Sequence, residues 1–183
     1  MEGYLHTIIG PMFSGKTSLM LHEMERFSRS GKRVVLFSAD NREEHPVVHS
    51  KRPIYKGIRV DKTRDPMKIL QRGLKYDVIG VDEVQFIDES LVSVLSSLVE
   101  QGKVVFASGL DQDYAREPFQ TTLKLICESE KVTRLTSVCQ KCGSHQAIRN
   151  IRKVDSKERV LEGAADIYEV RCRRCGELED VKR

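Results

Sequence analysis

Short apolar runs alternate along the chain with longer segments in which apolar residues recur at helical spacing. The runs at 5–9, 34–37, 77–83 and 104–108 predict buried strands, and a shorter strand is expected over 56–60. Helical spacing predicts helices over 17–27, 66–74, 91–99 and 121–126. Strands that alternate with helices are typical of a parallel sheet. The pattern therefore predicts an α/β domain over residues 1–135.

The first predicted strand leads into a loop that fits the phosphate-binding pattern Gly-x-x-x-x-Gly-Lys-Thr. The residues of this P-loop are Gly10, Pro11, Met12, Phe13, Ser14, Gly15, Lys16 and Thr17. In such a loop the backbone N–H groups surround the phosphates of a nucleoside triphosphate, Lys16 adds a positive charge, and the Thr17 hydroxyl can bind Mg²⁺. Its place between a predicted strand and a predicted helix favours this interpretation over a chance glycine turn.

The predicted strand 77–83 ends in two carboxylates. In a P-loop protein an acid at this place helps to hold magnesium, which is the role predicted for Asp82. Because successive strand side chains point in opposite directions, Glu83 can face an acceptor or a water instead; the alternative is a surface carboxylate that starts a turn. Asp40 and Arg42 follow the strand 34–37, where open α/β sheets bind ligands. The polar segment 41–57 is expected to be a loop.

Two Cys-x-x-Cys pairs mark a change of pattern after residue 138. Cys139 and Cys142 are separated by 29 residues from Cys172 and Cys175, and a glycine follows each pair. This arrangement predicts a structural Zn²⁺ site of the ribbon type, with redox pairs as the alternative. Between the pairs, 148–154 and 159–161 are strand-like, and the small residues near 163 predict a loop whose backbone can approach a base. The fifth cysteine, Cys127, is expected to be a small buried hydrophobe.

Composition adds a few constraints. A chain of 183 residues with 39% hydrophobic content fits one globular domain with a small appendage. Its net charge of +4 suits a polyphosphate ligand as well as a nucleic acid. No apolar run is long enough to cross a bilayer and no signal-peptide pattern is present, so we expect a cytoplasmic protein without membrane contact. A reducing cytosol fits cysteines that hold a metal.

Taken in order, these motifs resemble the type II thymidine kinases over nearly the whole chain. The likeness rests on Gly-Pro-Met-Phe-Ser-Gly-Lys-Thr, Val-Asp-Glu-Val-Gln-Phe, Leu-Asp-Gln-Asp-Tyr-Ala-Arg-Glu-Pro-Phe and the two cysteine pairs. It implies a RecA-like P-loop parallel-sheet domain, 1–135, and a small C-terminal zinc-ribbon or lasso domain, 136–183. It also implies transfer of the ATP γ-phosphate, with Mg²⁺, to the 5′-hydroxyl of thymidine or deoxyuridine. A homotetramer with feedback by dTTP is part of the same expectation.

The resemblance also implies roles for individual residues. Glu83 matches the general base for the 5′-hydroxyl, and Arg42, with Asp40 beside it, matches an arginine that assists the phosphates. Residues that match those packing the thymine and deoxyribose are Met12, Phe86, Leu110, Tyr114 and Phe119. Gly163, Ala164 and Tyr168 match the lasso, whose main chain hydrogen-bonds the base. Where the family usually has Thr-x-Arg near the thymine methyl group, this chain has Asn150-Ile151-Arg152, so Asn150 is expected at the base and affects base preference.

Two other functions fit parts of the pattern. A RecA-like ATPase, or a nucleic-acid-binding zinc-ribbon module, would also use a P-loop, a Walker B acid and basic cysteine knuckles. Only 45 residues follow Val138, which leaves little room for a second motor lobe, and no basic–aromatic stripe is present, so no nucleic-acid partner is expected. DNA-stimulated ATP hydrolysis would favour the motor. A catalytically silent binder is disfavoured by Lys16, Asp82 and Glu83.

Overall fold

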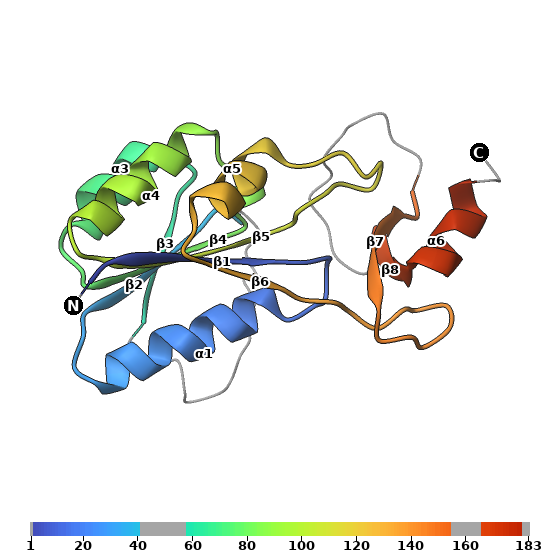
Figure 1. Cartoon of the computed structure of the whole chain (residues 1–183), viewed down its shortest axis with the longest axis horizontal. Helices are drawn as coiled ribbons and strands as arrows, with labels where there is room; N and C mark the ends of the chain where they lie inside the picture. The colour runs from blue at the N-terminus through green and yellow to red at the C-terminus, as the bar shows by residue number, and fades with distance from the viewer. Residues whose placement is uncertain (1, 41–57, 155–165, 181–183) are drawn as a thin grey trace.

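A parallel β-sheet forms the centre of the protein (Figure 1). The structure is a computed structural model that describes residues 2–40, 58–154 and 166–180. Within these ranges, six strands form one sheet in the order β3-β2-β4-β5-β1-β6, and every neighbouring pair is parallel. The strands are β1 (Tyr4–Ile9), β2 (Val34–Ser38), β3 (Arg59–Lys62), β4 (Val78–Asp82), β5 (Val104–Gly109) and β6 (Lys131–Arg134). Buried on both faces, β2, β4 and β5 read as continuous apolar runs, which is why the sequence pattern predicts them well.

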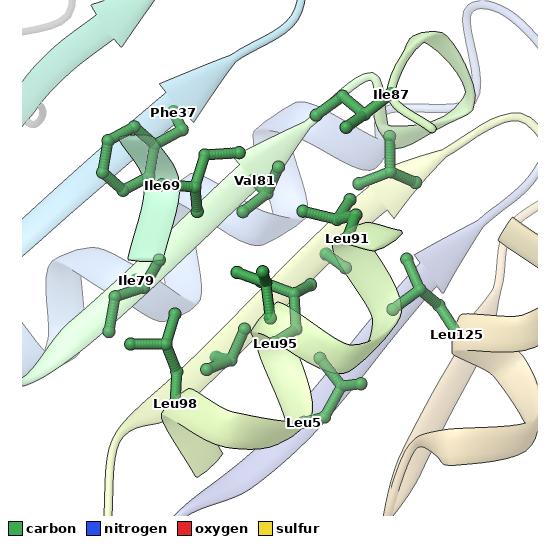
Figure 2. Close-up of a cluster of buried hydrophobic side chains, with 14 of the residues drawn as sticks. Leu5, Phe37, Ile69, Ile79, Val81, Ile87, Leu91, Leu95, Leu98 and Leu125 are labelled. Atoms are coloured by element: carbon green, nitrogen blue, oxygen red, sulfur yellow. The ribbon is translucent and has the colours of Figure 1, made fainter. Parts of the chain in front are cut away.

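Helices cover both faces of the sheet, as parallel connections require (Figure 1). Helix α1 (Lys16–Arg29) lies on one face, and α3 (Pro66–Gly73), α4 (Ser90–Glu100) and α5 (Gln120–Glu128) lie on the other. Each face has its own apolar core: Met20 and Met24 of α1 pack on one side, and Leu91, Leu95 and Leu98 of α4 on the other. Figure 2 shows the α4 leucines meeting Ile79 and Val81 of β4. These two cores hold the carboxyl ends of the strands in a fixed arrangement.

A second, smaller group of elements lies beyond the carboxyl end of β1 (Figure 1). Strands β7 (Ala147–Arg152) and β8 (Tyr168–Cys172) pair antiparallel, and α6 (Arg173–Asp180) follows directly. Their apolar cluster contains Ala147, Val170 and three cysteines, and the side chain of Met12 packs against it. The P-loop is therefore in contact with both parts of the protein. The predicted division into 1–135 and 136–183 stays a prediction.

Most predicted elements are present, and several details differ. The strand expected over 56–60 is observed as β3, Arg59–Lys62. Strand β6, β8 and α6 were not predicted, because β6 is an exposed four-residue edge strand and the other two surround the second cysteine pair. The expectation of a buried Cys127 was wrong, since it is exposed on α5. The strand expected over 159–161 lies outside the described residues. No helix among the described residues is long and apolar enough to span a membrane.

Candidate active site

The P-loop turns sharply between β1 and α1. Gly10 is required by a close approach, because a Cβ there would lie 2.5 Å from the carbonyl oxygen of Leu135. Phe13 and Gly15 have φ of 60° and 85°, so the chain passes through the left-handed region twice before α1 begins. The amino end of α1 and its preceding N–H groups form the kind of positive site that binds phosphates. The turn therefore has the backbone form that its sequence predicts.

Lys16 is held inside the loop. Its Nζ donates to the carbonyl oxygen of Pro11 at 2.8 Å, and the Ser14 hydroxyl donates to the same oxygen at 2.8 Å. Burial lowers the pKa of Lys16, while the nearby charges of Glu83, Asp82 and, more weakly, Asp111 oppose that shift. The charge of Lys16 therefore lies near the carboxylates of Asp82, Glu83 and Asp111, at or just after the ends of β4 and β5.

Asp82 is fully buried at the end of β4 and is surrounded by hydroxyl donors. Thr17 Oγ1 donates to Asp82 Oδ2 at 2.9 Å, and Ser108 of β5 makes a short hydrogen bond to Oδ1. Burial raises the pKa of Asp82, and the bonds from Ser108 and Thr17 and the charge of Lys16 oppose it. A buried carboxylate next to a P-loop hydroxyl is the oxygen ligand set that suits Mg²⁺. Thr17 and Asp82 therefore fit a divalent cation.

Glu83 leaves the strand in a left-handed conformation, with φ 57°. This turn directs its side chain away from that of Asp82. The sequence prediction relied on the alternation of strand side chains alone. Gln85 donates from Nε2 to Glu83 Oε2 at 2.5 Å and accepts the Leu110 N–H at 3.0 Å. Burial and the charge of Asp82 raise the pKa of Glu83. Gly109 leaves room for this bridge, because a Cβ there would lie 2.8 Å from Gln85 Oε1.

Asp40 lies at the end of β2 and is buried. The neighbouring carbonyl oxygen of Ala39 accepts a hydrogen bond from Arg64 Nε at 2.7 Å, and the Arg64 guanidinium lies 5.0 Å from the centroid of the Phe86 ring. Asp40 is close enough for its charge to add to the raised pKa of Glu83. Arg42 lies outside the described residues, so its predicted role on the phosphates stays a prediction.

The predicted acceptor residues come from three segments. Leu110, Tyr114 and Phe119 lie between β5 and α5, where Gln112 and Pro118 form an isolated antiparallel bridge. Phe119 is buried and precedes α5, and Phe86, in the 3₁₀ helix η2 (Val84–Phe86), packs partly against the core. Gly163 and Ala164 lie outside the described residues. The roles of these residues at a nucleoside stay predictions.

Arg152 links two of the predicted aromatic residues. Its guanidinium lies 3.7 Å from the centroid of the Tyr114 ring and 5.8 Å from that of Tyr168, and Nη2 lies 3.4 Å from the Tyr168 hydroxyl. Arg152 is itself buried. Such cation–π contacts are worth about 2 kcal/mol when desolvated. Arg152 therefore ties the β5–α5 segment to the start of β8.

The structure gives Met12 and Asn150 contacts within the protein, and their predicted roles at the acceptor base stay predictions. Met12, expected to face the acceptor base, packs its side chain against the cysteine cluster. Asn150, expected at the base, is 3% exposed and bonds through both ends of its amide to backbone groups of Met12 and Gln112. Both residues therefore join the P-loop to the smaller part of the protein.

The four predicted zinc ligands converge. The sulfur atoms of Cys139, Cys142, Cys172 and Cys175 all lie within 4.8 Å of one another, and those of Cys142 and Cys172 are 3.7 Å apart. Tetrahedral zinc with Zn–S bonds of about 2.3 Å needs sulfur atoms about 3.8 Å apart. Burial disfavours a thiolate at Cys139, but backbone N–H groups of Cys172, Lys141 and Cys142 outweigh it and lower its pKa to about 6. Burial and the neighbouring thiols raise the pKa of Cys175 to about 12. A cation that neutralises the thiolates fits this cluster.

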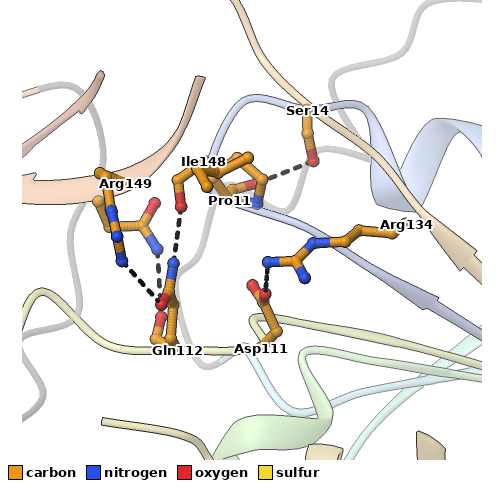
Figure 3. A network of polar contacts seen from close by, with 8 residues as sticks. Pro11, Ser14, Asp111, Gln112, Arg134, Ile148 and Arg149 are labelled. Atoms are coloured by element: carbon orange, nitrogen blue, oxygen red, sulfur yellow. Dashed lines mark hydrogen bonds and ion pairs between the residues drawn. The ribbon is translucent and has the colours of Figure 1, made fainter. Parts of the chain in front are cut away.

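Several residues of the site were missed from the sequence. They are Ser108, Arg64, Gln112 and Gln85, and the first three act through hydrogen bonds made across sequence distances that no motif spacing records. Gln85 had a local signal, since it lies two residues after Glu83 in the same motif. The pairing of Asp111 with Arg134 at 2.7 Å (Figure 3) joins the segment after β5 to the end of β6 and has no local signal at all.

The sheet, the P-loop and the Thr17–Asp82 pair define a P-loop nucleotide-binding α/β protein with a four-cysteine cluster beside its phosphate loop. Residues 3–176 match the family described as "Thymidine kinase". The chain therefore belongs to the thymidine kinase family, which is a family of ATP-dependent nucleoside kinases. This membership supports the kinase interpretation over a RecA-like motor.

Relatives and one solved structure agree with this assignment. The thymidine kinase of Thermococcus kodakarensis is 37% identical, with 93% of this chain and 92% of the relative covered. That of Rhodothermus sp. is 38% identical, with 94% and 81% covered, and that of Pyrobaculum aerophilum is 34% identical, with 93% and 96% covered. The crystal structure of the flagellar accessory protein FlaH from Methanocaldococcus jannaschii matches with a TM-score of 0.56 at 12% identity, covering 73% of this chain and 71% of that chain. This likeness bears on fold alone and agrees with the predicted RecA-like α/β class.

Proposed function

We propose that the protein transfers the γ-phosphate of ATP to the 5′-hydroxyl of thymidine, or of deoxyuridine, and so forms the 5′-monophosphate. The observation that carries this proposal is the pair of carboxylates at the end of β4. Asp82 is bonded to the P-loop hydroxyl of Thr17, whereas Glu83 is turned away from it and held by Gln85. This arrangement supports one site with a place for a metal–phosphate complex and a separate base for a hydroxyl group.

On the donor side, the residues mainly bind and neutralise charge. N–H groups of the P-loop and the Nζ of Lys16 hold the phosphates, and Thr17 with Asp82 would hold Mg²⁺. The metal, when bound, supplies charge stabilisation on the transferred group. Ser108 fixes one oxygen of Asp82, so that the other stays directed at Thr17. Arg42 is proposed to neutralise charge on the γ-phosphate as it moves.

On the acceptor side, Glu83 takes the proton of the 5′-hydroxyl while that oxygen forms a bond to the γ-phosphorus and ADP leaves. General-base help of this kind typically contributes ~10²–10⁴ in rate. Burial and Asp82 raise the pKa of Glu83, which makes it a better proton acceptor once it is ionised. Phe86, Leu110, Tyr114, Phe119 and Tyr168, with the backbone at Gly163 and Ala164, are proposed to hold the nucleoside.

The four cysteines are proposed to hold structural Zn²⁺, which fixes the base of the segment between β7 and β8. The sulfur separations and the depressed pKa of Cys139 support this role. We further propose, from family membership alone, a cytoplasmic homotetramer that is inhibited by dTTP.

The test is a panel of nucleosides with ATP and Mg²⁺, in which ADP and the nucleoside monophosphate are both quantified. We expect equal amounts of ADP and monophosphate with thymidine, a similar result with deoxyuridine, and little product with purine nucleosides. An equal response to every nucleoside, or ADP formation that depends on DNA instead, would overturn the proposal.

A further inference from the structure

The P-loop is bonded to β7 through one buried side chain. The backbone N–H of Met12 donates to Asn150 Oδ1 at 2.9 Å, and Asn150 Nδ2 donates to the carbonyl oxygen of Gln112 at 3.2 Å. A backbone N–H can only donate and a carbonyl can only accept, so these two partners fix which end of the amide is which. Both ends of the Asn150 amide are therefore engaged with main chain.

Two further bonds strengthen the same junction. Gln112 Nε2 donates back to the carbonyl oxygen of Ile148 in β7 at 2.8 Å (Figure 3), so the β5–α5 segment and β7 hold each other reciprocally. The Ser137 hydroxyl donates to the carbonyl oxygen of Phe13 at 3.2 Å. The side chain of Met12 packs against the cysteine cluster. We call the bonds among Met12, Gln112, Ile148 and Asn150, together with the bond from Ser137 to Phe13, the clasp.

We propose that Asn150 is a positioning residue for ATP binding: through the clasp it fixes the P-loop at Met12, and it does not read the acceptor base. The oxygen of the Asn150 amide is engaged by the P-loop and its NH₂ group by the β5–α5 segment, and burial keeps these bonds away from water. The clasp also connects the P-loop to the part of the protein that contains the cysteine cluster. The inference rests on ATP binding by the P-loop, which belongs to the proposed function, but not on thymidine as the acceptor.

Two substitutions separate the bonds of Asn150. Asn150→Asp keeps an acceptor for the Met12 N–H but cannot donate to Gln112. Asn150→Leu removes both bonds and leaves the Met12 N–H without its partner. Leaving a buried polar group unsatisfied typically changes an equilibrium constant by a factor of about 5 to 100. We therefore expect ATP to bind most tightly to wild type, less tightly to Asn150→Asp and least tightly to Asn150→Leu, across a range of that size.

The experiment measures ATP dissociation constants by calorimetry with Mg²⁺ and without nucleoside, together with the ratio of kcat/KM for thymidine and deoxycytidine. We expect weaker ATP binding in both variants and an unchanged ratio. ATP affinity equal to that of wild type, or a changed ratio with normal ATP affinity, would overturn the proposal, and the second outcome would show that Asn150 acts on the base.

Two neighbouring residues, Ser137 and Thr136, supply a second test and its matched control. Ser137→Ala removes the bond to Phe13, whereas Thr136→Val removes a hydroxyl bond of 2.8 Å to the carbonyl oxygen of His145, which does not reach the P-loop. We expect a modest loss of ATP affinity in the first and none in the second. Equal losses in both would count against the clasp.

A folding defect is separated from a positioning effect by the unfolding midpoint and the zinc content of each variant. If Asn150→Leu does not fold, Asn150→Asp and Ser137→Ala carry the test. Failure of wild-type protein to bind ATP would contradict the proposed function instead. Hydrogen exchange at residues 10–17 would then test the clasp, with faster exchange expected in Asn150→Asp and equal exchange contradicting it.

Discussion

Gln85 holds the carboxylate of Glu83 by a hydrogen bond of 2.5 Å from Nε2 to Oε2. Its other amide atom, Oε1, accepts the N–H of Leu110, so the orientation of the amide is fixed by the main chain at the end of β5. The predicted general base is thus aligned by a residue two positions later in the same motif.

Replacing Gln85 tests this alignment. Gln85→Glu keeps an acceptor for the Leu110 N–H but cannot donate to Glu83, so we expect turnover to fall ~10-fold or more while the ATP dissociation constant is unchanged. Gln101→Glu is a matched control, because Gln101 is exposed at the end of α4 and its amide bonds to Ser97, away from Glu83. Turnover in Gln85→Glu that matches the control would remove Gln85 from the alignment of Glu83.

Removal of a cysteine ligand tests the metal site. Cys172→Ser should abolish stoichiometric zinc binding and cost at least ~2 kcal/mol, which lowers the unfolding midpoint by ~4–8 °C for a chain of this size. Cys127→Ser is the control, since Cys127 is exposed on α5 and lies outside the cluster. Differential scanning calorimetry with metal analysis measures both effects. A zinc-free preparation with full thermal stability would contradict a structural role for the cluster.

His6 is expected to make stability depend on pH. Burial within the sheet, where β1 lies between β5 and β6, and the charge of Lys131 lower the pKa of His6, although Glu23 opposes the shift. Near pH 6.5 the unfolded chain takes up a proton at His6 and the folded chain does not, so protonation favours unfolding. The contribution of neutral His6 to the free energy of unfolding is therefore complete above that pH and is lost as the pH falls toward the folded pKa. The slope cannot exceed ~1.4 kcal/mol per pH unit for one group.

Urea unfolding between pH 7.5 and about 5 measures this effect, because this interval spans the ordinary histidine pKa. His6→Gln keeps an amide that can bond to Thr133, the partner of His6 at 2.9 Å, and should flatten the slope. The exposed His22 on α1 provides the control substitution, His22→Gln, which should leave the slope unchanged. An identical slope in wild type and His6→Gln would assign the pH dependence to other groups.

Sequence patterns predicted the central sheet because its inner strands are apolar on both faces and its helices are amphipathic. They could not predict β6, whose Lys131–Arg134 sequence has no apolar run and whose position depends on pairing with β1. The P-loop, Asp82, Glu83 and the cysteine cluster were found because their chemistry requires fixed local spacing. The contacts of Met12 and Asn150, and the bridge made by Arg152, join distant segments, which spacing does not record.

The central claim is that Glu83 activates the acceptor hydroxyl beside a P-loop that binds ATP independently. Rapid-quench measurement of thymidine monophosphate in a single turnover, for wild type and Glu83→Gln with ATP and Mg²⁺ saturating, tests it most directly. The account predicts an unchanged ATP dissociation constant and a loss of at least ~10² in the rate of monophosphate formation. A rate within a few-fold of wild type would contradict it.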